Sequence, residues 1–202
     1  MDTQESNNSE TLWLTACVKG NLDVVKHFVE NGQDIEAANS DGVTGLIAAS
    51  MFGKADVVRF LLLKGARVDR TTNDGNPTLY FAVSEGYLEV CRELVAKGTD
   101  VNQKAGDGLS PWLVACGNGH LDIVQLFVEN EQDIEATGSG GSTGLIAACI
   151  DGNRDIVRFL LSKGARTDRT MNGGITALEI AVKKGHGEIV ELLTRHASTS
   201  AN

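Results

Sequence analysis

The sequence predicts an all-α solenoid of helix-turn-helix units that are joined by β-hairpin-like loops. Three observations support this fold class. A glycine recurs every 33 residues, two short apolar blocks lie within each interval, and Asp-Gly turn signals open several units, as at 41–42 and 74–75. The recurring glycines are Gly20, Gly53, Gly86, Gly119, Gly152 and Gly185. A unit of this kind has one apolar side, so it needs a copy of itself on either side.

Each unit carries a start and a stop signal for its first helix. A hydroxyl-bearing residue recurs where an N-cap is expected, because its oxygen can accept from an unpaired helix N–H group. These caps are Thr11, Thr44, Ser110, Thr143 and Thr176. Pro111 follows at the favoured first helical position, whereas the third unit has Pro77 in the cap register. The glycines of the 33-residue series are expected to end these helices in a left-handed conformation.

A second glycine series follows the second helices, where a positive φ is also expected. Its members are Gly32, Gly65, Gly98 and Gly164. Glu131 and Ala197 stand in this register in the fourth and sixth units. A glutamate with positive φ is strained, so Glu131 is predicted to destabilise its loop.

Three ladders of apolar residues are predicted to form the core between units, because the same register recurs in each one. The first helices supply Trp13, Leu46, Leu79, Trp112, Leu145 and Leu178, together with Ala16, Ala49, Ala82, Ala115, Ala148 and Ala181. The second helices supply Val25, Val58, Cys91, Val124, Val157 and Val190. Helices of eight to ten residues are marginal alone, so stacking of these ladders is expected to stabilise them.

The 33-residue period with two helices and a turn resembles the ankyrin repeat. The segments that carry the resemblance are DGVTGLIAA, DGLSPWLVACGNGHLDIV, KGTDVN and GGITALEIAVKKGH. It implies one ankyrin domain over residues 9–198, between a disordered tail at 1–8 and a C-terminal tail at 199–202. The repeats are predicted at 9–40, 41–73, 74–106, 107–139, 140–172 and 173–198. The family's Thr-Pro-Leu-His tetrapeptide is not intact in any repeat, so the histidine that ties neighbouring loops is missing.

A longer period of 99 residues overlies the short one. Residues 10–103 match residues 109–202 at about half of the positions. VENGQDIEA recurs as VENEQDIEA, and GARVDRT recurs as GARTDRT. Duplication of a three-repeat block would produce this pattern, and so would the engineered joining of two copies.

Composition limits the possible functions. The chain of 202 residues has a net charge of −9. This charge argues against the basic face that binding to nucleic acids or to anionic membrane surfaces requires. The sequence has neither an apolar run long enough to span a membrane nor a visible signal peptide. We therefore expect a monomer in the cytoplasm or nucleus that binds neither nucleic acid nor membranes.

No residue pattern predicts catalysis, a cofactor or a metal. The cysteines, Cys17, Cys91, Cys116 and Cys149, have no metal-ligand spacing and are expected to be small core residues. The glycine-rich run at 138–144 lacks the Lys-Ser/Thr of a phosphate-binding loop and is interpreted as the turn of the fifth repeat. We expect no enzyme activity.

Charge alternates between successive loops. Asp34 and Glu36 face the loop with Lys64, Arg67 and Arg70, and the pattern recurs 99 residues later. Two interpretations remain open. The charges could form surface ion pairs between repeats, worth about 0–1 kcal/mol per pair, or two basic patches could bind an acidic partner.

The resemblance implies that function resides on a concave face, made of loop tips and the exposed side of the first helices. The chain is expected to bind a partner protein or peptide there; the alternative is a structural or engineered scaffold without a specific partner. Met51 and Phe52 are the most informative pair, since polar residues could occupy their registers, although packing against the next loop would also explain them. The predicted binding residues are Val43, Met51, Phe52, Asn76, Ser84, Glu85, Leu109, Asn118, Ser142, Ile150, Asp151, Lys183 and Lys184.

Overall fold

Helices dominate the computed structural model, which describes the backbone of residues 2–200 and the side chains of residues 11–198. The described chain contains twelve α-helices, one 3-10 turn and one two-stranded β-sheet. The first helices of the repeats are α1 (Asp2–Lys19), α3 (Gly45–Met51), α5 (Thr78–Ser84), α7 (Pro111–Asn118), α9 (Gly144–Asp151) and α11 (Ala177–Lys184). The second helices are α2 (Leu22–Glu30), α4 (Ala55–Leu63), α6 (Leu88–Val95), α8 (Leu121–Glu129), α10 (Arg154–Ser162) and α12 (Gly187–Ser200).

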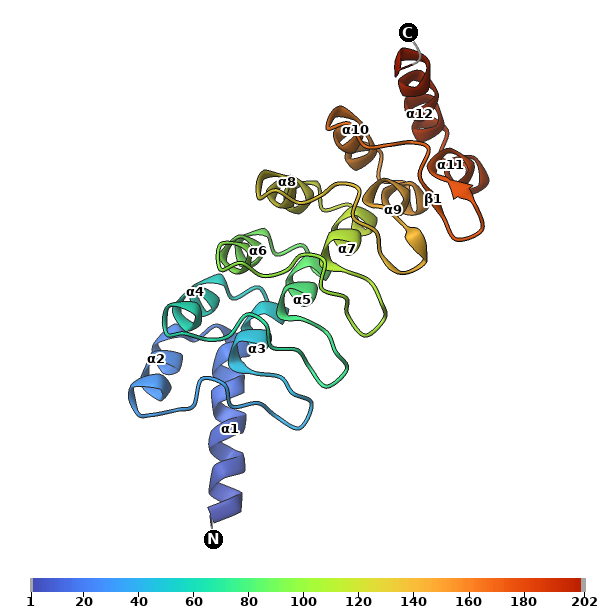
Figure 1. Cartoon of the computed structure of the whole chain (residues 1–202). Helices are drawn as coiled ribbons and strands as arrows, with labels where there is room; N and C mark the ends of the chain where they lie inside the picture. The colour runs from blue at the N-terminus through green and yellow to red at the C-terminus, as the bar shows by residue number, and fades with distance from the viewer. Residues whose placement is uncertain (1, 201–202) are drawn as a thin grey trace. The chain divides into compact units, whose positions relative to one another are not determined.

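The helices form two compact units, residues 1–100 and residues 101–202. In unit 1, α3 packs between α1 and α5, and α4 packs between α2 and α6. In unit 2, α9 packs between α7 and α11, and α10 packs between α8 and α12. Figure 1 shows that first helices and second helices form separate rows within each unit. The fold is thus the predicted all-α stack of helix pairs, whereas the single domain over residues 9–198 stays a prediction.

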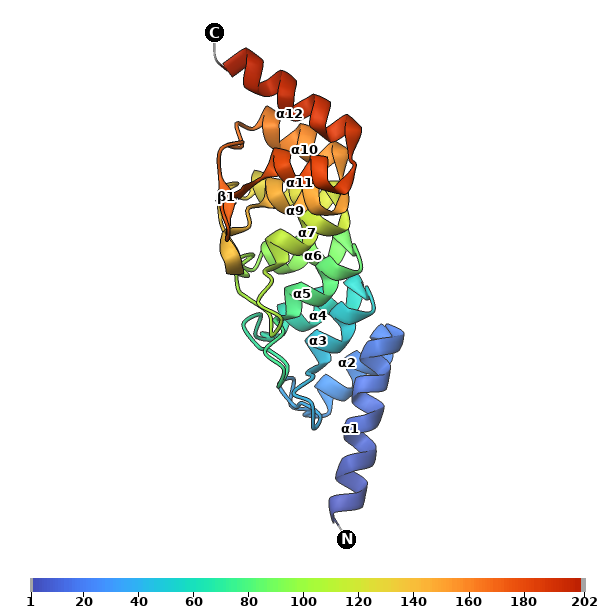
Figure 2. The same ribbon diagram turned by 90° about the vertical axis from the view of Figure 1, so that its right-hand side faces the viewer.

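Hairpin-like loops precede the first helices and project to one side of each unit (Figure 2). Single antiparallel bridges close three of them, pairing Ala38 with Thr44, Thr71 with Pro77, and Thr137 with Thr143. In the last loop the bridge extends to two strands, β1 (Thr170–Met171) and β2 (Ile175–Thr176). The glycine-rich run contains the 3-10 turn η1 (Ser139–Gly141) at the tip of the loop before α9, in the fifth repeat, as the turn interpretation expects.

Side-chain caps begin the first helices at four of the five predicted positions. Thr44, Thr143 and Thr176 accept from the backbone N–H three residues on, at 3.2–3.3 Å. Ser110 does the same for the helix that starts at Pro111. Thr176 also forms a capping box with Glu179, whose carboxylate accepts from the Thr176 N–H at 2.8 Å.

The start of the first repeat differs from its prediction. The first helix was expected to begin at a Thr11 cap, after a disordered tail at residues 1–8. The described backbone is instead helical from Asp2, which places Thr11 inside α1. The cap prediction for Thr11 is therefore wrong, because the N–H groups that follow Thr11 have carbonyl acceptors one turn earlier in α1 and need no cap.

Left-handed residues end the helices where the two glycine series predict them. The six glycines of the 33-residue series have φ between 67° and 84°, and the four after the second helices have φ between 79° and 93°. Glu131, at φ 64°, is the one non-glycine residue with positive φ in the described part of the chain. The prediction from register is confirmed at Glu131, whereas Ala197 lies within α12.

The predicted ladders form the core. All six alanines of the second ladder are buried, and so are both tryptophans and all four cysteines. Two members of the last repeat depart from the prediction, since Leu178 is 38% exposed and Val190 is half-buried. The physical reason is local, because the described residues place no further first helix against the outer side of α11.

Candidate partner-binding face

In two of the loops, an asparagine or aspartate near the tip accepts hydrogen bonds from the backbone that follows it. Asn39 Oδ1 accepts from the N–H groups of Asp41 and Val43, both at 3.0 Å. Gly42 then turns the chain with φ 79°. Asp107 plays the equivalent part before α7, where its Oδ1 accepts from the Leu109 N–H at 2.9 Å. These bonds fix how Val43 and Leu109 are presented beside the helix starts.

Neighbouring loops are tied together without the family's histidine. In unit 1, the Asn73 N–H donates to the Asp41 carbonyl at 2.9 Å, and the Asn73 amide donates to the Ser40 carbonyl at 2.8 Å. In unit 2, the Asn172 N–H donates to the Gly140 carbonyl at 2.7 Å, and Ser139 Oγ donates to the Gly108 carbonyl at 3.1 Å. Both backbone and side-chain hydrogen bonds thus join neighbouring loops within each unit.

The C-terminal ends of the first helices are held by the following repeat. Inside each unit, the residue after a left-handed glycine lies against the glycine of the preceding repeat. A methyl group on Gly53, for example, would lie 2.9 Å from the Tyr87 ring. In unit 2 this residue also bonds to the preceding helix. The Asn153 amide donates to the carbonyls of Cys116 and Gly117, and His186 Nε2 lies 3.4 Å from the Ile150 carbonyl. Tyr87, Asn153 and His186 lie outside the predicted binding set, although their shared register after the glycine was a usable signal.

In unit 1 the predicted binding residues lie at two sites. Val43 and Asn76 lie on the loops, and the rest lie where α3 and α5 end. Phe52 is 47% exposed, Glu85 is exposed, and Met51 and Ser84 are half-buried. Ser84 Oγ donates to the Tyr80 carbonyl at 2.9 Å, which occupies its donor within the helix. Because α3 packs on α5, the structure brings the two helix ends together around Phe52.

In unit 2 the predicted residues are more polar. The loop before α7 presents Leu109, which is 43% exposed, and the loop before α9 presents the half-buried Ser142. At the ends of α7, α9 and α11 lie Asn118, Ile150, Asp151, Lys183 and Lys184, of which all but Ile150 are exposed. The Asp151 carboxylate lies close above Gly117, where a methyl group would be 3.1 Å from it.

An aromatic pair on α5 lies outside the predicted set. The rings of Tyr80 and Phe81 are half-buried and meet edge to face, 6.0 Å apart at 90°. Alanine and isoleucine fill these two registers in the preceding repeat, so the change in size at these positions was the available sequence signal. The pair adds apolar surface to the helix that ends at Ser84.

A family model for three copies of the ankyrin repeat matches residues 12–105 and again residues 107–202. The chain belongs to the ankyrin repeat family. The two matches divide the chain into the same two three-repeat halves that the 99-residue offset relates.

Solved ankyrin structures are similar over most of the chain. The human ASB11 ankyrin repeat domain is 25% identical with a TM-score of 0.83, covering 91% of this chain and 82% of that one. The Bcl-3 ankyrin repeat domain, described as a unique member of the IkappaB protein family, is 28% identical with a TM-score of 0.81, covering 91% and 85%. An ankyrin repeat domain from Acinetobacter baumannii AYE is 25% identical with a TM-score of 0.84, covering 93% and 98%. A search of curated proteins gave no match.

Ankyrin repeats are generally protein–protein interaction modules, and they are typically not catalytic. Two further findings bear on other classes of function. Among the residues that the structure describes, no helix is long and apolar enough to cross a membrane. Within the same residues, no three His, Cys, Asp or Glu side chains lie together in a way that could hold a metal ion.

The charged loops of the ankyrin stack form ion pairs between repeats. Glu36 accepts from the Arg67 N–H at 2.9 Å and lies 3.6 Å from Arg70 Nε. Glu135 repeats this geometry in unit 2 with the Arg166 N–H at 2.8 Å and with Arg169 at 3.5 Å. The ion-pairing interpretation is confirmed at these positions, and it weakens the case for two free basic patches.

The cysteine thiols are unsuited to nucleophilic chemistry. All four are buried, and burial raises the pKa of both Cys17 and Cys149 to about 12. A thiol with such a pKa stays protonated near neutral pH, whereas the thiolate is the reactive form. The cysteines therefore act as small core residues, as predicted.

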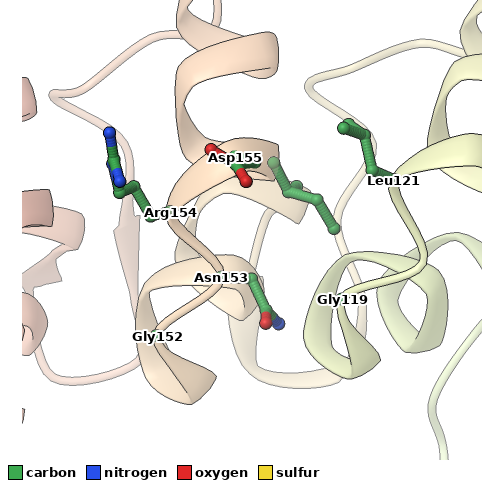
Figure 3. A pocket seen from close by; sticks show the side chains of 7 residues that line it. Gly119, Leu121, Gly152, Asn153, Arg154 and Asp155 are labelled. Carbon is green, nitrogen blue, oxygen red and sulfur yellow. The ribbon is translucent and has the colours of Figure 1, made fainter.

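A shallow hollow of about 370 Å3 lies between the turn that joins α7 to α8 and the turn that joins α9 to α10. Figure 3 shows its lining, Gly119, Leu121, Gly152, Asn153, Arg154, Asp155 and Ile156. Its polar groups already have partners, since Asn153 bonds to carbonyls of α7 and Asp155 pairs with Arg158 at 3.3 Å. Arg154 likewise pairs with Glu188 at 2.9 Å. The hollow lacks the convergent unpaired groups of an active site.

Proposed function

We propose that the chain is a non-catalytic protein-binding module that takes a partner protein or peptide on its concave face. This face consists of the loop tips and the adjoining ends of the first helices, with all thirteen predicted residues. The observation that carries the proposal is the exposure of Phe52, at 47%, at the end of a helix whose neighbours have polar residues in the same register. A large exposed apolar side chain bordered by polar groups is the kind of residue that anchors a partner.

Four residues on α3 and on or at the end of the adjoining helix α5 support a binding role for Phe52. Met51 precedes it and is half-buried, the α5 aromatic pair lies on the adjacent helix, and Glu85 is exposed at the end of that helix. An apolar centre with a charged rim resembles the anatomy of protein interfaces. In unit 2, Leu109 supplies a second exposed apolar group, with Asp151, Lys183 and Lys184 as charged residues on the same kind of surface.

A scaffold without a specific partner is the second candidate. The near-repetition of residues 10–103 at 109–202 favours it, because a duplicated block needs no partner to explain its similarity. Location inside the cell, in cytoplasm or nucleus, stays a prediction under either candidate.

The test compares matched variants against one partner. A partner captured from cell lysate by the parent protein is identified, purified and titrated calorimetrically. We expect Phe52→Ala and Leu109→Ala each to weaken binding by more than about 1 kcal/mol while thermal stability changes little.

Leu63→Ala is the control, since Leu63 is 71% exposed on the second-helix side and should not touch a partner on the concave face. Parent-like affinity in both Phe52→Ala and Leu109→Ala would reject the concave-face proposal. If the Phe52→Ala variant captures every protein that the parent captures, or if the parent captures none, the result would favour the scaffold.

A further inference from the structure

The last repeat leaves two apolar positions uncovered that are buried elsewhere in the stack. On α11, Leu178 is 38% exposed and Val182 is 61% exposed. Their equivalents 33 residues apart in the other repeats are fully buried. For Val182 these are Cys17, Ser50, Val83, Cys116 and Cys149; for Leu178 they are Trp13, Leu46, Leu79, Trp112 and Leu145. We call Leu178 and Val182 the tail face.

The first repeat leaves a second pair of apolar positions uncovered. Leu12 on α1 is 54% exposed, and Val24 on α2 is 44% exposed. Their equivalents in the other five repeats are again buried. For Leu12 these are Gly45, Thr78, Pro111, Gly144 and Ala177; for Val24 they are Val57, Val90, Ile123, Ile156 and Ile189. We call Leu12 and Val24 the head face.

Contacts inside each unit show that these two faces are complementary. In unit 1, a methyl group on Gly45 would lie 2.6 Å from Trp13 Cζ2 and 3.1 Å from Cys17 Sγ. Gly45 stands in the Leu12 register, and Trp13 and Cys17 stand in the Leu178 and Val182 registers. Where the second repeat stacks on the first, the Leu12 register therefore meets the Leu178 and Val182 registers.

Unit 2 repeats the same contact independently. A methyl group on Gly144 would lie 2.7 Å from Trp112 Cζ2 and 2.9 Å from Cys116 Sγ. The second helices of successive repeats also pack on each other, since α4 packs on α2 and α10 packs on α8. The Val24 register thus lies in a repeat-to-repeat interface too.

Side-chain sizes in these registers compensate each other. A tryptophan faces glycine in both repeats where it occurs, because no Cβ would fit beside its ring. Where leucine replaces tryptophan, as at Leu46 and Leu145, the residue in the next repeat's Leu12 register is a larger Thr78 or Ala177. Leu178 is also a leucine, which leaves room for a side chain larger than glycine at the position that Leu12 would take.

We propose that the chain does not stay the monomer expected from its sequence but associates head to tail with a second copy of itself. Leu12 and Val24 of one copy then stack on Leu178 and Val182 of the other. The contact continues the interface that already joins successive repeats, and both complementary faces belong to this same chain. Soluble repeat proteins normally have polar outer faces on their capping repeats. In this chain, the outer faces of the first and the sixth repeat both expose apolar residues. Such a heterologous contact does not close on itself, so it generates open chains rather than a symmetric dimer.

Sedimentation equilibrium over a concentration series tests the proposal with the full chain. We expect the weight-average mass of the parent to rise above 21.4 kDa with increasing concentration, without a plateau at the dimer. Leu12→Glu breaks the head face and Val182→Glu breaks the tail face, and each should weaken self-association by at least ~10-fold, as expected for a charge placed in an apolar contact. Because both side chains are exposed, the glutamates should leave helical circular dichroism unchanged.

Mixing the two variants gives the decisive result. The Leu12→Glu copy keeps an intact tail and the Val182→Glu copy keeps an intact head, so an equal mixture should form a heterodimer and stop there. Leu63→Glu, an exposed leucine on α4 away from both faces, is the matched control and should associate like the parent. A parent that stays at the monomer mass up to ~1 mM, the concentration of a very weak complex, would overturn the proposal. So would a parent that stops at a dimer, or a mixture of the two variants that stays monomeric.

Discussion

Residues 31–36 in unit 1 and residues 130–135 in unit 2 form the same loop, and their sequences differ only where Gly32 is replaced by Glu131. Gly32 has φ 86° and Glu131 has φ 64°, although the left-handed region is unfavourable for glutamate. The following bonds are nearly identical, since Gln33 N donates to Phe28 at 3.0 Å and Gln132 N donates to Phe127 at 3.1 Å. The comparison indicates that the rest of the loop, which is identical in the two units, keeps its backbone conformation even where the residue at this one position opposes it.

A second pair of loops shows that hydrogen bonds between repeats also persist when a residue differs between the units. Asp41 accepts a backbone bond from Asn73 in unit 1, and Gly140 accepts one from Asn172 in unit 2. The side chain of the acceptor residue differs between the units, but the bond uses only its carbonyl. Backbone hydrogen bonds between loops are therefore kept when a substitution removes the side chain of the acceptor residue.

The largest effect is expected when the two units are separated. Because stability in a repeat stack is a sum of repeat and interface terms, residues 1–100 and 101–202 expressed alone should each fold with reduced stability. The denaturant m-value of each should be about half that of the full chain, since m scales with the surface exposed on unfolding. Urea melts followed by circular dichroism measure this. A half without helical signal would contradict the view of the units as comparable stacks.

An intermediate effect is expected from exchanging the residues at the matched loop positions. Glu131→Gly should stabilise unit 2 by about 0.5–1 kcal/mol, the steric relief less the added backbone entropy of glycine in the unfolded chain. Gly32→Glu should destabilise unit 1 by a similar amount of about 0.5–1 kcal/mol. No heavy atom lies within 4 Å of a methyl group placed on Gly32, so the effect should come from the backbone alone.

Denaturant melts of both variants beside the parent give these values, provided the m-value is unchanged. Gly65→Glu is a matched control, because its Cβ position is equally open and its φ is 93°. A lower midpoint for Glu131→Gly would mean that the glutamate side chain contributes more than its strain costs.

The smallest effect is expected from the paired Asp69 and Asp168. A hydrogen bond from the neighbouring guanidinium, of Arg67 or Arg166, lowers the pKa of each carboxyl below its usual range. A lowered pKa in the folded state means that the stabilisation is present above the ordinary pKa and is lost as pH falls through the folded value. Asp69→Asn and Asp168→Asn should therefore lower the melting temperature slightly and equally near pH 7, and the difference from the parent should vanish in acid.

Thermal melts between about pH 7 and about pH 2, the range that spans carboxylate titration, measure this dependence. Unequal losses in the two variants would show that the duplicated ion pairs are not energetically equivalent. A difference that persists at the acid end would assign the effect to packing rather than to charge.

The sequence by itself determined the period, the helix pairs, the caps at Thr44 and Thr143, and the left-handed glycines. These features follow from local chemistry, because a hydroxyl before a helix or a glycine after one acts on backbone groups a few residues away. It also determined the buried ladders within the stack, since equal registers must meet when equal units pack. Of the thirteen predicted binding residues, the sequence could place each on a loop or a helix end.

Only the tertiary structure decided which of these positions are covered. Leu46 and Leu178 share one register, yet the first is buried and the second is 38% exposed, because burial depends on whether another helix packs outside it. The sequence at Thr11 likewise resembles the other caps, but the helix continues through it to Asp2. The ties between loops, from Asn73 to Asp41 and from Asn172 to Gly140, depend on backbone groups that every residue carries. No residue type marks such bonds, so they emerge only when neighbouring repeats are placed side by side.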